Sequence, residues 1–221
     1  MTIPDAFLSG KLVDGDGRPP RTACFTVVTE GNFHGQRGFI KVQGDHMFHP
    51  DGTFASPPLS PGKYFLRFFG LLQGEPESGG DKADMQRRVF DFIYPNAVSV
   101  SEAAPFDLRA GETMNSVFDV PDPTWFSVAG RVKGSLPIAD RSHISIMFQR
   151  NMGILEGVGG SGFRVETDGS FEGMLLRGSY VASLHEMTDP ESDGYMRSLR
   201  QFGSTEWVIE GDTLNLEIPI R

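Results

Sequence analysis

Short apolar segments, separated by turns rich in glycine and proline, follow one another along this chain. Segments rich in β-branched or aromatic residues predict strands over 21–29, 38–43, 63–69, 115–120, 143–149, 180–185 and 214–220. In the last of these, apolar side chains fall at every second position, so Asn215, Glu217 and Pro219 face away from the core. Pro219 also predicts an edge strand or a strand end, because proline cannot donate to a central ladder. The pattern predicts an all-β protein.

The second half of the chain repeats the landmarks of the first half in the same order. A strand signal with a central glycine occurs at Gly10 and again at Gly130. An Asp-Gly pair two residues before a Phe comes next in each half and predicts a tight hairpin turn, in which the Phe begins the return strand. The later paired positions are Asp51 and Asp168, Gly62 and Gly178, and Gly111 and Gly211. Because a repeat marks a repeated structural unit, the chain is expected to hold two copies of one fold.

The two copies differ in length, and the difference locates an insert and a boundary. The offset between paired glycines falls from 120 residues at the first pair to 100 at the last, so the first copy carries the extra residues. We expect the insert at about 70–108, with a short helix over 81–88. Two prolines within 121–124 disfavour both helix and central strand, as expected for a short linker. The expected domains are therefore 1–122 and 123–221.

Composition narrows the class of protein further. The 27 glycines and 15 prolines in 221 residues exceed average usage of about 7% and 5%, which suits many short strands joined by turns. The 18 phenylalanines predict an interior filled with apolar rings. A net charge of −9 opposes attraction to nucleic acids and anionic membranes, so we expect neither as a partner. The single cysteine, Cys24, is expected to be a buried structural thiol.

Neither a membrane span nor an export signal is expected from the sequence. No run approaches the roughly 18 apolar residues of a spanning helix. Residues 1–6 lack the basic and apolar regions of a signal peptide. These observations leave the compartment open.

Motifs in the first copy carry a resemblance to a known family. Residues 8–20 combine a glycine-bearing strand with a G-R-P turn, residues 51–54 form a D-G-x-F turn, and residues 61–64 form a P-G-x-Y strand entry. Each copy resembles a carboxypeptidase regulatory-like domain, which is a transthyretin-like (prealbumin-like) β-sandwich with Ig-like Greek-key connections. The second copy departs from the pattern at 133–137 and at 176–178, where the G-R-P and P-G motifs are replaced.

The resemblance implies a fold, a function class and a location. It implies two tandem sandwiches that serve as a non-catalytic structural or recognition module of an exported or surface-associated bacterial protein. The expected location is therefore extracytoplasmic, the expected partner is a protein or a carbohydrate, and no cofactor is expected. The chain is predicted not to be an enzyme. Fold alone does not establish function, which depends on individual side chains.

One cluster offers ligands for a metal ion. His46, His49 and Asp51 supply two imidazoles and a carboxylate, which suit zinc or iron. In a strand, however, His46 and His49 point to opposite faces because their separation is odd. The two histidines could bind one ion only if the chain bends between them. Ordinary strand and turn residues are therefore the favoured interpretation, and no metal site is predicted.

A second resemblance supports a remote enzymatic alternative. Residues 141–146 are partly similar to the R-P-x-H-I-H run of intradiol ring-cleaving dioxygenases, whose iron is held by two tyrosines and two histidines. Ser145 stands in place of the second histidine, and no tyrosine pair accompanies the run. His143 is therefore expected to be a strand-end residue. The glycine-rich segment 157–162 precedes a strand and predicts a hairpin loop rather than a phosphate site.

The stronger alternative is a carbohydrate-binding module. Sugars stack on exposed aromatic rings, and the candidates are Tyr94, Trp125, Tyr195 and Trp207. The competing interpretation of each is burial at a domain edge. The sequence leaves the ligand and the oligomeric state open.

Overall fold

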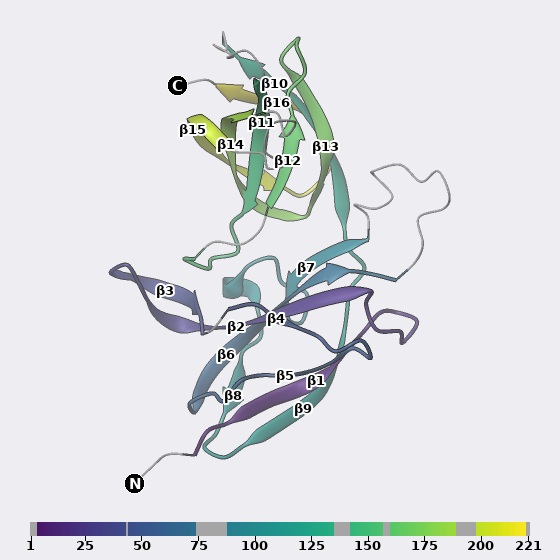
Figure 1. Ribbon diagram of the computed structural model, residues 1–221, viewed down its shortest axis with the longest axis vertical. Coiled ribbons are helices and arrows are strands. Elements are labelled where there is room, and N and C mark those ends of the chain that lie inside the picture. Colours follow the sequence, from purple (N-terminus) through teal and green to yellow (C-terminus); the bar gives the residue numbers. More distant parts are fainter. Residues whose placement is uncertain are drawn as a thin grey trace. The chain divides into compact units, whose positions relative to one another are not determined.

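The computed structural model describes residues 4–42, 44–73, 88–134, 142–156, 160–188 and 198–219. Almost every element in these ranges is a β-strand (Figure 1), and the helical element among them is the short 3-10 turn η1 (Val100–Glu102). The expected all-β class is confirmed. In this part of the chain, no helix is long and apolar enough to cross a membrane. The helix expected over 81–88 lies outside the described residues, except for Arg88.

Contacts between residues divide the chain into two compact units. The first unit comprises Met1–Pro123 with Gly153–Glu156, and the second comprises Thr124–Met152 with Gly157–Arg221. The short segment assigned to the first unit pairs with it through a parallel bridge between Phe39 and Ile154. Each unit has a hydrophobic core of its own.

The first unit is built from two sheets. The smaller sheet has the order β5-β1-β9, with β1 (Phe7–Val13) between β5 (Thr53–Ala55) and β9 (Thr113–Asp119). The larger sheet has the order β3-β2-β6-β7, with β4 paired to β2 and β8 paired to β6. Its strands are β2 (Thr22–Phe33), β3 (Gln36–Lys41), β4 (His46–Met47), β6 (Gly62–Leu71), β7 (Val89–Ile93) and β8 (Phe106–Leu108).

Phenylalanine rings fill the space between these sheets, as the composition predicts. Phe54 from the smaller sheet and Phe68 from the larger one are both buried. The Phe118 ring centroid lies 5.6 Å from that of Phe54 and 5.2 Å from that of Phe68. Such tilted ring pairs contribute about 0.5–1.5 kcal/mol beyond the area that they bury.

The other face of the larger sheet holds a buried ion pair. Arg67 on β6 is 3% exposed, and it donates from Nε and Nη2 to the two carboxylate oxygens of Asp91 at 2.8 and 3.0 Å. The guanidinium also lies 4.3 Å from the centroid of the Phe69 ring. Because a buried charge without its partner is costly, this bidentate pair couples β6 to β7.

The second unit has the same two-sheet plan with fewer strands. The smaller sheet has the order β13-β10-β16, and the larger one has the order β12-β11-β14-β15. The strands are β10 (Trp125–Lys133), β11 (Ser142–Arg150), β12 (Gly160–Arg164), β13 (Ser170–Leu176), β14 (Gly178–Thr188), β15 (Ser198–Ile209) and β16 (Thr213–Pro219). As expected from Pro219, β16 is an edge strand that ends at this proline.

The repeated sequence landmarks occupy matching places in the two units. Gly10 pairs with Phe54 on one side and with Ser116 on the other, while Gly130 pairs with Phe171 and Leu216. In each unit the first strand is therefore antiparallel to the strand that follows the Asp-Gly turn and parallel to the last strand. A side chain at either glycine would clash with the parallel neighbour, since an added Cβ would lie 2.2 Å from its carbonyl oxygen.

Turn chemistry is repeated as well. The Asp51 carboxylate accepts hydrogen bonds from the backbone N–H and the hydroxyl of Thr53 at 3.0 and 2.7 Å, and Asp168 accepts the same two from Ser170 at 2.9 and 2.5 Å. The hydroxyl of Tyr180 donates to the carbonyl of Leu176, four residues earlier, at 2.8 Å. Tyr64 makes the matching bond in the first unit.

One local prediction was wrong, and another was right only in part. The Asp-Gly turns are tight, but the strands on either side do not form a hairpin. In the first unit β4 pairs with β2 and β5 pairs with β1, so the turn carries the chain from one sheet to the other. The hairpin expected at 157–162 is present, since β12 pairs antiparallel with β11, but the strand begins at Gly160, earlier than expected, and 157–159 lie outside the described residues.

Candidate functional site

The candidate metal ligands His46, His49 and Asp51 lie around the first Asp-Gly turn without converging. The His46 ring packs on Phe25 with a centroid distance of 5.2 Å, and its Nε2 is buried without a hydrogen-bond partner among the described residues. His49 is exposed at the turn, and the carboxylate of Asp51 is engaged by Thr53, whose hydrogen bonds lower the pKa of Asp51. In the part of the chain that is described, no group of three His, Cys, Asp or Glu side chains could hold a metal ion.

The aromatic candidates also lie apart. Tyr94 packs into the first core, with its ring centroid 5.2 Å from that of Phe118. Trp207 on β15 packs against the second core, and Trp125 at the start of β10 is half-buried. Trp125 and Trp207 belong to different sheets, and Tyr195 lies outside the described residues.

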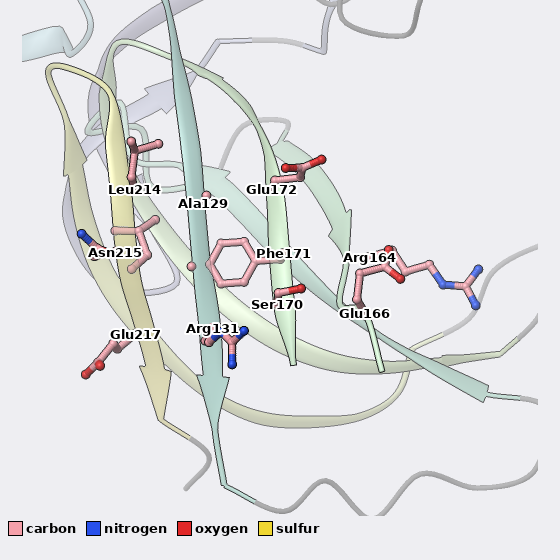
Figure 2. A pocket seen from close by; sticks show the side chains of 12 residues that line it. Ala129, Arg131, Arg164, Glu166, Ser170, Phe171, Glu172, Leu214, Asn215 and Glu217 are labelled. Carbon is pink, nitrogen blue, oxygen red and sulfur yellow. The ribbon is translucent and has the colours of Figure 1, made fainter. Parts of the chain in front are cut away.

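The stronger candidate is a groove on the three-stranded sheet of the second unit, which we call the β10 groove (Figure 2). Its volume is about 760 Å³. Along β10, Val128 is buried in the core while Arg131 is exposed. Ala129 lies on the same face of β10 as Arg131, and its small side chain leaves room above the middle of the sheet. The groove is lined by Ala129, Gly130, Arg131, Arg164, Glu166, Ser170, Phe171, Glu172, Leu214, Asn215, Leu216 and Glu217.

Charges of both signs surround this groove. Figure 2 shows Arg131 on the central strand, with Glu217 on one side and Arg164 and Glu166 on the other. Arg131 Nη2 lies 3.2 Å from a carboxylate oxygen of Asp168. The pKa of Asp168 is lowered, mainly by its hydrogen bonds from Ser170 and also by the charge of Arg131.

The ion pairs at the β10 groove are open to solvent. The Arg131 side chain is 68% exposed, and the Glu217 carboxylate, which lies 2.6 Å from Lys133 Nζ, belongs to a side chain that is 59% exposed. Exposed pairs contribute only about 0–1 kcal/mol to stability, so they can exchange partners at little cost. A guanidinium donates, a carboxylate accepts, and the Asn215 amide does both. The groove can therefore bind a ligand that carries both donors and acceptors.

A second groove, of about 480 Å³, lies on the four-stranded sheet of the same unit, and we call it the β14 groove. Among its lining residues, the Ser183 hydroxyl lies 2.8 Å from Nε2 of His185, two residues along β14. Burial lowers the pKa of His185, so the neutral ring is favoured. The thioethers of Met147 and Met187 contribute to an apolar lining.

The sequence contained a partial signal for these residues. The alternation in the last strand placed Asn215 and Glu217 away from the core, and both line the β10 groove. Arg131 and His185 were not singled out, because a single charged or imidazole side chain in a strand has no distinctive spacing. Their significance depends on neighbours from strands that are distant in sequence.

Comparisons with known proteins leave the family open. No family model matches the chain, and no curated protein matches its sequence. Among solved structures, the Bacillus anthracis TIE protein is similar at 10% identity with a TM-score of 0.31, over 99% of this chain and 34% of its own. A DUF3823 family protein from Bacteroides uniformis matches at 12% identity and a TM-score of 0.33, over 93% of this chain and 100% of its own.

A third structure is a streptococcal ancillary pilin. Its identity is 12% and its TM-score 0.37, over 100% of this chain and 64% of the pilin. The chain thus spans about a third of the TIE protein and about two thirds of the pilin. At these TM-scores the similarities carry no functional argument.

Proposed function

We propose that this chain is a non-catalytic recognition module of an exported or surface-associated bacterial protein. In this proposal each copy is a carboxypeptidase regulatory-like domain, the boundary lies near residue 122, and the second domain carries the binding surface. The observation that carries the proposal is the β10 groove, where exposed donors and acceptors from three adjacent strands surround a hollow of about 760 Å³. The extracytoplasmic location rests on the family resemblance of the first copy.

A rigid sheet supports recognition because strands hold their side chains in fixed positions. β10 is the central strand, so Arg131 is held between β13 and β16 by pairing on both sides. Because Gly130 has no side chain, β10 packs closely against Leu216 of β16 and Phe171 of β13. The backbone positions from which these side chains extend are therefore fixed before binding, and only the exposed side chains themselves lose freedom when a ligand binds.

The alternative ligand class is carbohydrate, and one observation favours it. Arg131, Asn215 and Glu217 present planar polar groups that can bond to adjacent sugar hydroxyls. The four aromatic candidates do not line this groove, so recognition here would depend on hydrogen bonds rather than ring stacking.

The proposal is tested on arrays of bacterial and host polysaccharides and of peptides, probed with the full chain. We expect retention on at least one array member and its loss in the double variant Arg131→Ala/Asn215→Ala. The control is Gln149→Ala, which alters the β14 groove, and it should bind as the wild type does. Absence of retention on every array, or retention by the double variant, would contradict the proposal.

A further inference from the structure

The last strand of the first unit, β9, has one edge with which no other described strand pairs. β9 lies at the end of the order β5-β1-β9 and pairs only with β1 in the described sheets. The seven residues of β9 align with β1 in an unbroken parallel register from Thr113 to Asp119. A long, regular edge of this kind presents unpaired backbone groups to any strand of suitable sequence.

The hydrogen bonds to β1 show which residues of β9 face outward. The N–H of Phe7 donates to the carbonyl of Glu112, and the N–H of Val120 donates to the carbonyl of Val13. In a parallel pair, alternate residues turn both backbone groups to the same neighbour. The even-numbered residues of β9 therefore bond to β1. The odd-numbered residues, Thr113, Asn115, Val117 and Asp119, direct their N–H and C=O groups to the free edge.

The equivalent strand of the second unit, β16, carries features that prevent pairing at its edge, and β9 lacks these features at the same positions. Because Gly10 pairs with Ser116 and Gly130 with Leu216, Val117 corresponds to Glu217 and Asp119 to Pro219. β16 therefore has a charge and a proline at these places, and it also has an irregularity in its register with β10. Charge, proline and bulge are the features that prevent edge pairing.

The other long edge strands are protected too. β13 carries Glu172 in its middle, and β15 has two irregularities in its pairing with β14. Among the described edge strands of seven residues or more, β9 is the one without an internal charge, a proline or a bulge. Its Val117 is instead an exposed hydrophobic residue, with 67% of its surface accessible.

We propose that β9 pairs antiparallel with β9 of a second copy of this chain about a two-fold axis. The axis passes through Ser116, so Asn115 lies opposite Val117 of the second copy and Thr113 lies opposite Asp119. Both residues of each of these pairs are odd-numbered. Their free N–H and C=O groups therefore face each other, as hydrogen bonding between the two copies requires. Asp119, the one charge in the strand, meets a threonine rather than another carboxylate.

This register also covers apolar surface. Near the axis, Val117 on the exposed face of each copy lies next to the other copy. On the opposite face, which packs against the core, half-buried Met114 does the same. The same patch serves on both copies, as a closed two-fold interface requires, so the assembly stops at two chains. An extended segment of an unrelated protein could use the same edge, but the matched register favours a second copy.

Sedimentation equilibrium of the full chain over a wide concentration range tests the proposal. We expect the mass to rise from 24.3 kDa to about twice that value. Val117→Glu introduces the residue found at the equivalent place in the second unit, and it should raise the dissociation constant at least tenfold. The matched control is Val208→Glu on edge strand β15, where the valine is 64% exposed, and it should leave association unchanged.

Hydrogen exchange identifies the interface independently. The amides of Thr113, Asn115 and Val117 should become protected as concentration rises, and they should remain unprotected in Val117→Glu. A mass that stays at 24.3 kDa at every concentration would overturn the proposal. Association that Val208→Glu weakens as much as Val117→Glu, or protection confined to other strands, would overturn it as well.

Discussion

Gly130→Ala probes the close contact between β10 and β16 on which the second sandwich depends. An added Cβ would lie 2.2 Å from the carbonyl oxygen of Leu216 and 2.7 Å from Cζ of Phe171. Both neighbours are nearly inaccessible, at 2% and 3% exposure, so neither can move into solvent. Overpacking costs about 1–3 kcal/mol, and contact with backbone places this site near the upper end. Replacing glycine by alanine also stabilises the protein by about 0.4–1 kcal/mol, because alanine restricts the unfolded chain. The net loss of stability is about 2 kcal/mol.

Urea denaturation followed by tryptophan fluorescence measures this loss. Both tryptophans, Trp125 and Trp207, belong to the second unit, so the signal reports on the unit that is changed. With a slope of about 1–3 kcal/mol/M, the midpoint should fall by about 1 M. Gly211→Ala is the control, because an added Cβ there meets nothing within 4 Å and the φ angle lies outside the left-handed region. Equal midpoints for the two variants would refute the reasoning.

Three further predictions concern single polar groups. Asp91→Ala leaves the buried Arg67 charge without its bidentate partner and should cost about 3 kcal/mol. Because both tryptophans lie in the second unit, this urea denaturation is followed by circular dichroism, and an unchanged midpoint for the first unit would contradict the prediction. Tyr180→Phe removes the hydrogen bond to the Leu176 carbonyl and should cost about 1 kcal/mol, which the same measurement checks. Burial lowers the pKa of His185 from 6.5, so the unfolded chain takes up the proton first as the pH falls. Stability should therefore decline below about pH 6.5, and His185→Gln should remove that part of the decline, as measured by midpoints across this range.

Much of the fold follows from local sequence. Gly10 and Gly130 were recognisable as paired landmarks, and the structure shows why: each lies against the carbonyl of a parallel strand, where a Cβ does not fit. Pro219 identified an edge strand for a different reason, because proline has no N–H to donate to a central ladder. The hairpins were predicted wrongly because a turn sequence fixes the bend but not the partner of the strand that follows. Partner choice depends on which sheet offers a matching face, and that is a property of the whole unit.

The candidate site was less accessible to prediction. Arg131 and Asn215 are 84 residues apart in the chain, but their strands, β10 and β16, are neighbours in the sheet. The sequence of a single strand indicates only which side chains face outward, as the alternation of apolar residues in the last strand did for Asn215. For Tyr94 and Trp207 the sequence left both exposure and burial open, and each ring is half-buried against the core of its unit.

Chemical-shift mapping tests the central claim, that recognition occurs at the β10 groove, most directly. The full ¹⁵N-labelled chain is titrated with an array member that the wild type retains. The account predicts shifts concentrated at residues of β10, β13 and β16, including the backbone amides of Arg131, Glu172 and Glu217, with little change in the first unit. Shifts confined to the β14 groove around His185, or to the strands of the first unit, would contradict it.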